Sequence, residues 1–135
     1  MNQKVKNIEE VIKVIEKIKI KGKLIVTTSG SFDILHYAHV NLLEKAKNQG
    51  DILIVLLNSD ISIKKNKGDK RPIVSQNERA KMLAALECVD YVSIFDDDKP
   101  LDYLSKIKGN IHVKGGSFIE ERIKEERELI ESWGG

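Results

Sequence analysis

The feature that most constrains the fold is an alternation of short β-branched runs with longer helical segments. Four runs are typical of strands: Leu24–Thr28, Ile52–Leu57, Tyr91–Phe95 and Ile111–Val113. The first run is apolar or β-branched throughout, which is typical of a strand buried on both faces. The alternation predicts an α/β fold, a Rossmann-like open parallel sheet with helices on both faces and right-handed crossovers.

Capping signals mark where helices begin. Asn7 with Glu10, Ser75 with Glu78 and Ser117 with Glu120 have the spacing of capping boxes. We expect helices over residues 8–18, 38–48 and 100–106, one after Ser75 that covers Met82, Leu83 and Leu86, and a charged one that ends near Ser132.

The remaining segments are predicted from their polarity. The polar stretch Ser59–Pro72 shows no periodicity and is predicted to be a loop. Met82 and Cys88 are expected in the core, and Asp96–Asp98 in a solvated turn. The apolar stripe of residues 8–18 packs either on its own sheet or on a second subunit.

Composition limits the classes of protein that fit. The 135 residues suit one domain, residues 1–135, and the 41% of apolar residues suit a globular core. A net charge of +2 gives no support to nucleic-acid binding. Cys88, the single cysteine, excludes an internal disulfide and fits the cytoplasm. The N-terminal stretch lacks the apolar core of a signal peptide, and no stretch suits a membrane span.

Three polar loops follow predicted strands. Thr27–Ser31 ends the first strand, Asn58–Asp60 follows the second, and Lys114–Gly116 follows the fourth. In open parallel sheets, ligands bind beyond the carboxyl ends of the strands. We therefore expect the three loops to meet at one ligand site.

His36 and His39 stand three residues apart at the first of these junctions. A zinc site needs further ligands, and no cysteine or carboxylate pattern supplies them. The pair could simply begin a helix. A strand-to-helix junction also binds anions through backbone N–H groups and the helix dipole, and imidazoles can donate to phosphate. The small, hydroxylated stretch Thr27–Ser31 favours the phosphate interpretation.

Residues Gly30–His39, GSFDILHYAH, resemble the signature G-x-F-D-x-x-H-x-G-H of the cytidylyltransferase-like nucleotidyltransferase superfamily. Similarity continues over roughly residues 23–118 and is greatest to the heptose 1-phosphate adenylyltransferase family. The stretches that carry it include Asn58-Ser59-Asp60, Lys67-Gly68, Arg71-Pro72, Glu78-Arg79 and Val113-Lys114-Gly115-Gly116.

The resemblance implies transfer of AMP from ATP, with Mg²⁺, to a sugar phosphate, heptose 1-phosphate by preference, and release of pyrophosphate. Two alternatives stay open. One is a cytidylyltransferase that uses CTP and glycerol 3-phosphate or another alcohol phosphate. The other is a non-catalytic nucleotide-binding domain. The resemblance also favours a homodimer.

The resemblance further implies roles for individual residues. The catalytic residues would be His36, His39 and Lys47, of which Lys47 matches a lysine that faces the reacting phosphates. Nucleotide binding would fall to those histidines together with Ser29, Gly30, Ser31, Phe32, Tyr37, Ala38, Lys114, Gly115 and Gly116. The acceptor and its phosphate would be bound by Asn58, Asp60, Lys67, Arg71 and Arg79. No protein side chains are expected to bind a metal.

Two departures from the pattern bear on these expectations. Ala38 stands where the signature has glycine, and we expect its methyl group to be tolerated, with weaker nucleotide binding. The chain ends at Gly135, before a further strand and a Ser/Thr-rich helix start found in relatives. We therefore expect a domain that is short at its C-terminus. Either the chain is a truncated form, or another segment supplies the missing contacts, or triphosphate binding is impaired.

Overall fold

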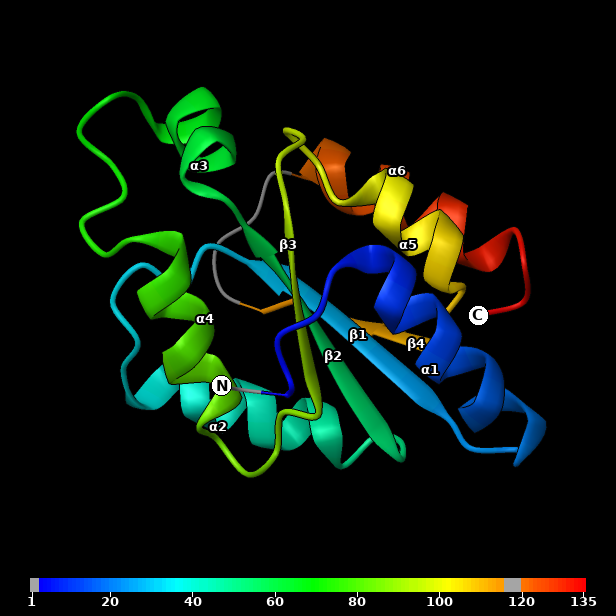
Figure 1. Cartoon of the computed structure of the whole chain (residues 1–135). Helices are drawn as coiled ribbons and strands as arrows, with labels where there is room; N and C mark the ends of the chain where they lie inside the picture. The colour runs from blue at the N-terminus through cyan, green and yellow to red at the C-terminus, as the bar shows by residue number, and fades with distance from the viewer. Residues whose placement is uncertain (1–2, 116–119) are drawn as a thin grey trace.

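The strands form one parallel sheet in the order β3-β2-β1-β4 (Figure 1). The computed structural model describes residues 3–115 and 120–135. Within these residues the strands are β1 Ile25–Gly30, β2 Ile52–Asn58, β3 Tyr91–Phe95 and β4 Ile111–Val113. The predicted α/β class and parallel sheet are confirmed, with β1 two residues longer at its carboxyl end than expected.

The strand order reverses next to β1. The chain moves from β1 to β2 and then β3 on one side, and β4 returns to pair with the other side of β1. Thr28 of β1 is in register with Val55 of β2 and with Val113 of β4. The β1/β4 pair is therefore the switch point of the sheet, where ligands of open α/β sheets bind.

Helices cover both faces of the sheet. They are α1 Ile8–Ile20, α2 Tyr37–Lys47, α3 Asp60–Lys67, α4 Gln76–Ala84, α5 Leu101–Ile107 and α6 Glu120–Glu131. Figure 1 shows α2 and α4 on one face, and α1, α5 and α6 on the other. Each face of the sheet buries its own apolar cluster.

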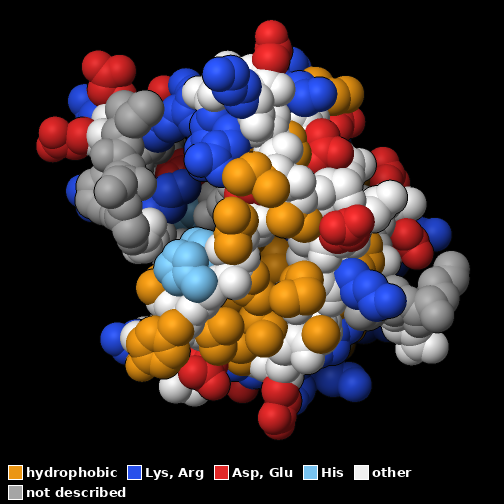
Figure 2. Space-filling model, turned by 90° about the vertical axis from the view of Figure 1, so that its left-hand side faces the viewer, with side chains coloured by type: hydrophobic (Ala, Val, Ile, Leu, Met, Phe, Trp, Pro, Cys, Tyr) orange, Lys and Arg blue, Asp and Glu red, His pale blue; other side chains and the backbone are white. Residues whose placement is uncertain are grey.

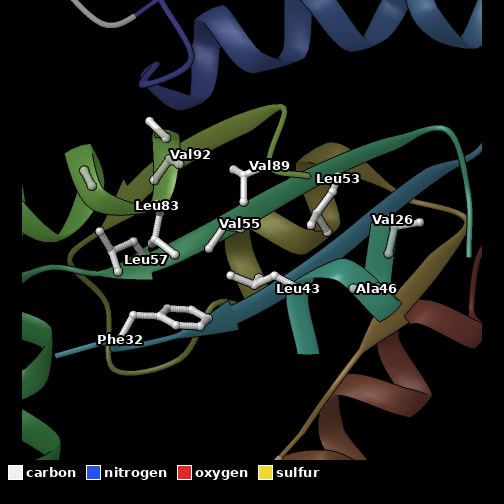
Figure 3. Packing of buried hydrophobic residues seen from close by; sticks show 12 residues of the cluster. Val26, Phe32, Leu43, Ala46, Leu53, Val55, Leu57, Leu83, Val89 and Val92 are labelled. Carbon is white, nitrogen blue, oxygen red and sulfur yellow. The ribbon is translucent and has the colours of Figure 1, made fainter. Parts of the chain in front are cut away.

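The α2/α4 cluster is built from alternate residues of β1 and β2 (Figure 3). Val55 and Leu57 of β2 meet Leu43 of α2 and Leu83 of α4 on this face. The ring of Phe32, from the turn after β1, extends toward Leu43. The turn that follows β1, at the carboxyl ends of the strands, is thus anchored in the hydrophobic core.

The apolar stripe of α1 packs on the opposite face of the sheet. Ile8, Val11 and Ile15 are buried with Ile54 and Phe95 of the sheet. Both halves of the predicted capping box are present: Asn7 Oδ1 accepts from Glu10 N–H at 2.9 Å, and Glu10 Oε1 accepts from Asn7 N–H at 3.1 Å. Helix α1 therefore packs on its own sheet.

The predicted loop over residues 59–72 is wrong in its first half, which forms α3. Ser59 caps this helix, because its hydroxyl oxygen accepts from Ser62 N–H at 3.1 Å. Asp60 in the first turn and lysines in the last turn complement the helix dipole. Ser62 and Ile63 are the buried residues of α3, so its inward face has almost no apolar periodicity to detect.

The placement of Met82 in the core is also wrong. Its side chain is 54% exposed, whereas its neighbour Leu83 is fully buried. Helix α4 ends at Ala84, so Leu86 lies beyond it. Ser75 caps α4 by accepting from Glu78 N–H at 3.4 Å. Cys88, expected in the core, is only half-buried and packs against the edge of a core cluster. Asp96–Asp98 are exposed, as predicted.

The adjacent pair Leu83 and Met82 tests this packing. Leu83→Ala removes a fully buried side chain, so we expect the free energy of unfolding to fall by about 2–5 kcal/mol. Met82→Ala, on the exposed side of the same helix, should change it by less than about 1 kcal/mol. Urea denaturation measures both. Equal losses would contradict the assigned orientation of α4.

Candidate active site

The turn from β1 to α2 is shaped by close contact between Gly30 and Phe32. A Cβ atom on Gly30 would lie 2.9 Å from the Phe32 ring. Phe32 has a positive φ of 44°, which is uncommon for a residue with a side chain. Its ring is buried and meets the His39 ring edge-on, with centroids 5.3 Å apart. The turn thus supports one face of an imidazole.

His36 and His39 cap α2 through their own rings. His36 is the N-cap residue, and its Nδ1 accepts from Ala38 N–H at 3.2 Å. His39 Nδ1 accepts from His36 N–H at 3.3 Å. The ring centroids are 4.0 Å apart. The three-residue spacing therefore has a structural reason, because it places the second ring over the N-cap residue.

The capping bonds fix the chemistry that remains on each ring. A neutral imidazole that accepts at Nδ1 carries its hydrogen on Nε2. Both Nε2–H groups are then donors, which suits phosphate oxygens and not a metal ion. Burial, and then the proximity of His36, lower the pKa of His39 below 6.5. His39 is therefore mainly neutral at pH 7.

A cavity of about 500 Å³ opens at the carboxyl edge of the sheet. All three loops expected to meet contribute to its wall. They supply the predicted residues Ser29, Gly30, Ser31, Asn58, Lys114 and Gly115, which are joined by Lys67 of α3. Gly115 packs closely there: a Cβ atom on it would lie 2.7 Å from the Leu42 side chain of α2, which would have to shift.

The cavity wall is rich in cations. Lys67, Lys99, Lys114 and Arg122 all line it. Figure 2 shows Lys and Arg side chains gathered above the pale blue histidine surface, with hydrophobic side chains below. This arrangement favours an anionic ligand that spans the histidines and the cavity.

Arg79 is buried and does not line the cavity, where it was expected to bind the acceptor. Its side chain is 1% exposed, and all of its bonds are internal. Nη1 donates to Ser31 O at 2.8 Å and to Asn58 O at 2.7 Å, while Nη2 donates to Asp60 Oδ1 at 2.8 Å. Nε donates to Val74 O at 2.8 Å. Arg79 therefore holds together loops that line the cavity, and it also engages Asp60.

Asp33 fixes the segment that follows α3. Its carboxylate accepts from the N–H groups of Ile73 and Val74 at 2.9 Å and from Arg71 Nη1 at 3.3 Å. Burial raises the pKa of Asp33, but these donors outweigh burial and lower it overall. Arg71, which pairs with Asp33, is exposed to solvent and does not line the cavity.

The predicted place of Lys47 at the phosphates is wrong. Its ammonium donates to Asp90 Oδ2 at 2.5 Å, and the same carboxylate oxygen accepts from Leu53 N–H at 2.8 Å. Leu53 and Asp90 lie at the amino ends of β2 and β3. Lys47 ends α2, and eleven residues of helix separate the two ends by about 16 Å. Lys47 therefore lies at the opposite edge of the sheet from the histidines.

The other predicted residues lie outside the cavity lining or outside the described residues. Tyr37 and Ala38 are exposed in the first turn of α2, and the amide of Ala38 serves the cap. Gly116, like Ser117 of the third expected capping box, lies outside the described residues.

Four residues of the cavity wall were not predicted from the sequence. Asn66, Lys99, Arg122 and Glu126 line the cavity. Arg122 donates to Asn66 Oδ1 at 2.5 Å and pairs with Asp98 at 3.5 Å, which joins α6 to α3. The four-residue spacing of Arg122 and Glu126 places both on one face of α6, and this was the available signal.

Across residues 3–115 and 120–135, no three His, Cys, Asp or Glu side chains gather as a metal site would require. None of the helices in these ranges has the length and apolarity to cross a membrane.

Comparison with known proteins identifies the family. A sequence model described as Cytidylyltransferase-like matches residues 27–134, which include the turn, the histidines and the cavity residues. The chain belongs to the cytidylyltransferase-like family. The resemblance of GSFDILHYAH to the superfamily signature is thereby confirmed.

Curated relatives share nearly half of the residues. The bifunctional protein HldE of Geobacter metallireducens is 47% identical over 98% of this chain, and that of Helicobacter pylori is 48% identical over 91%. In each case the match spans 27% of the relative. The chain thus corresponds to about a quarter of these bifunctional proteins.

Solved structures support the fold. The lipopolysaccharide core biosynthesis protein of Thermoplasma volcanium has a TM-score of 0.69 and 29% identity, over 84% of this chain and 90% of that one. Pantoate-beta-alanine ligase of Francisella tularensis has a TM-score of 0.67 over 96% of this chain and 62% of that one. At 15% identity, the ligase supports the fold alone.

Arg79 can be tested against Arg71. Arg79→Lys keeps the charge but cannot reproduce the guanidinium fork, so buried carbonyl groups lose their donors. We expect the free energy of unfolding to fall by about 2–4 kcal/mol. Arg71→Lys, at an exposed ion pair, should cost less than about 1 kcal/mol. Equal urea midpoints for the two variants would contradict the role of Arg79.

The state of His39 can be tested by NMR titration of its ring, assigned with His39→Gln. In the free protein we expect a pKa below 6.5, because burial and His36 disfavour the charged ring. Pyrophosphate bound at the Nε2–H groups should raise this pKa, because a nearby anion favours the imidazolium form. An unchanged or lowered pKa in pyrophosphate would contradict an anion site at this ring.

Proposed function

We propose that the chain transfers AMP from ATP to a sugar phosphate, with heptose 1-phosphate as the expected acceptor, and releases pyrophosphate. The observation that carries the proposal is the pair of Nε2–H donors at the start of α2, beside a cation-lined cavity at the sheet's carboxyl edge. Similarity to HldE over nearly the whole chain supports the adenylyl choice.

The reaction is a single displacement at phosphorus. A phosphate oxygen of the acceptor attacks the α-phosphorus of ATP, forming one P–O bond as the bond to the pyrophosphate oxygen breaks. Negative charge grows on the oxygens around the α-phosphorus. His36 and His39 donate from Nε2 to these oxygens, and their Nδ1 atoms are held by backbone N–H groups. The rings are therefore oriented before substrate arrives, which is the arrangement that stabilises a transition state most effectively.

The cations of the cavity neutralise the two substrates. Lys67 and Lys114 come from opposite sides of the site, on α3 and after β4, and both line the cavity. In this proposal they bring two anionic substrates together despite their mutual repulsion, and Arg122 forms part of the same wall. Positioning and charge neutralisation then supply most of the rate enhancement.

Mg²⁺ belongs to the proposal as a companion of the nucleotide. The described residues offer no group of three carboxylate or imidazole side chains to hold the ion. Its oxygen ligands would therefore come mainly from the triphosphate, as is usual for this ion. Bound to the triphosphate, Mg²⁺ would neutralise part of its negative charge.

Two further expectations remain predictions. A cytoplasmic location fits a chain whose single cysteine, Cys88, is a free thiol. A homodimer is expected from the resemblance. The stripe of α1 is not available for a subunit contact, because it packs on its own sheet.

Activity assays test the proposal and the role of the histidines. We expect pyrophosphate release with ATP and heptose 1-phosphate, and a rate lowered about tenfold or more by His39→Ala, because one transition-state hydrogen bond is lost. Lys47→Gln, at the far end of the same helix, should keep kcat within about threefold. The assay also includes CTP and glycerol 3-phosphate.

The outcomes separate the alternatives. Release with CTP and glycerol 3-phosphate alone would favour a cytidylyltransferase. Nucleotide binding without release from any pair would favour a non-catalytic domain. A loss in Lys47→Gln as large as in His39→Ala would contradict the assignment of Lys47 to the opposite edge.

A further inference from the structure

A charged cluster that shares Lys114 with the proposed phosphate site lies at the β1/β4 switch point. Glu126 of α6 lines the cavity, although its side chain is only 6% exposed. Its Oε1 lies 3.7 Å from His112 Nε2 of β4 and 3.6 Å from Lys114 Nζ. His112 Nδ1 is in turn 2.8 Å from the hydroxyl of Thr27 on β1. The cluster therefore spans the two strands between which the sheet order reverses.

Glu126 lacks the hydrogen bonds that a buried carboxylate normally has. Both neighbouring nitrogen atoms are beyond hydrogen-bond distance, and neither Glu126 Oε2 nor His112 Nε2 has a hydrogen-bond partner among the described residues. Burial raises the pKa of Glu126, but His112 and Lys114 outweigh burial and lower it overall, so the group is a carboxylate at pH 7. A buried carboxylate without donors is costly unless a ligand supplies them.

The chemistry of the cluster selects the kind of ligand group. A phosphate oxygen has no hydrogen to donate, and the Glu126 charge repels it. A hydroxyl group donates to the carboxylate and can accept from Lys114 at the same time. Acidic side chains at the switch point of nucleotide-binding sheets commonly accept from ribose hydroxyls in this manner. Glu126 and Lys114 together therefore match a sugar hydroxyl better than an anion.

The position of the cluster agrees with this choice. Lys114 Nζ is 3.4 Å from Ser29 Oγ, so the cluster is connected to the strand that leads into the histidine turn. A nucleotide whose phosphates meet His36 and His39 has its sugar as the next group along. Both sugars of the proposed reaction, the ribose and that of the acceptor, carry hydroxyl groups.

We propose that Glu126 is a substrate-binding residue whose carboxylate accepts a hydrogen bond from a sugar hydroxyl in the cavity, with Lys114 donating to the same sugar. The inference rests on the proposed function for the identity of its ligands, and it names the ribose of ATP as the first candidate and the acceptor sugar as the second.

Calorimetric titration with ATP, 2′-deoxy-ATP and 3′-deoxy-ATP tests the ribose. We expect the wild-type chain to bind at least one deoxy analogue about tenfold or more weakly than ATP, the size expected for a hydrogen bond to a charged group. Glu126→Gln should weaken ATP binding similarly and remove the discrimination. If Glu126 had only a structural role, Glu126→Gln would weaken the binding of all three nucleotides equally. Glu128→Gln, on the exposed side of α6, is the matched control.

The acceptor sugar gives a different pattern. If it is the ligand group, Glu126→Gln leaves all three nucleotide affinities unchanged and raises the KM for the sugar phosphate about tenfold. Wild-type values in every measurement, or equal losses for all ligands, would overturn the inference. Should Glu126→Gln fail to fold by circular dichroism, Glu126→Asp carries the same test, because it keeps the charge beside His112 and withdraws the oxygens by one methylene.

These measurements separate the inference from the proposed function. Ribose discrimination that depends on Glu126, without pyrophosphate release, would refute the transfer reaction and support the sugar contact. Release of pyrophosphate, with no effect of Glu126→Gln on the binding of either sugar, would support the transfer reaction and refute the sugar contact. A wild-type chain that binds neither ATP, its analogues nor the sugar phosphate would refute both.

Discussion

The geometry of the site depends on one buried cation. The Arg79 guanidinium donates to carbonyl groups at the ends of β1 and β2 and to the carboxylate that begins α3. Parallel strands bring these loops to one edge, but they do not by themselves fix the loops relative to one another. Arg79 does so from a position without solvent access, where each lost bond leaves a buried acceptor unsatisfied. The ligand therefore meets a surface already arranged before binding.

The histidine pair shows how one spacing can serve structure and chemistry together. Each ring uses Nδ1 to satisfy backbone donors at the start of α2, which any helix must satisfy in some way. The same bonds leave Nε2–H as the free group on each ring. The helix-start and phosphate interpretations of the sequence were thus not competitors, and the cap is what orients the donors.

The sequence predicted the sheet and the convergence of its three polar loops, because β-branched runs and capping signals are local properties. It missed α3, whose buried face includes the hydroxyl of Ser62 rather than an apolar stripe. It misplaced Lys47 and Arg79 because a motif match reports neither the direction of a side chain nor its partners. It missed Glu126, because the helical spacing that Glu126 shares with Arg122 does not reveal that folding buries it beside His112 and Lys114.

The two ends of the site are attached to the fold unequally. In the proposed function, the phosphate end is built on β1 and β2, which pair along six residues each, and on the α2 cap. The sugar end is built on β4, which pairs with β1 through three residues, and on α6. Substitutions in the later segment can therefore alter which sugar is accepted without disturbing the groups that act on phosphorus. If the proposed function holds for this chain, its substrate range and its reaction type are therefore carried by different parts of the fold, and one could be exchanged while the other is retained.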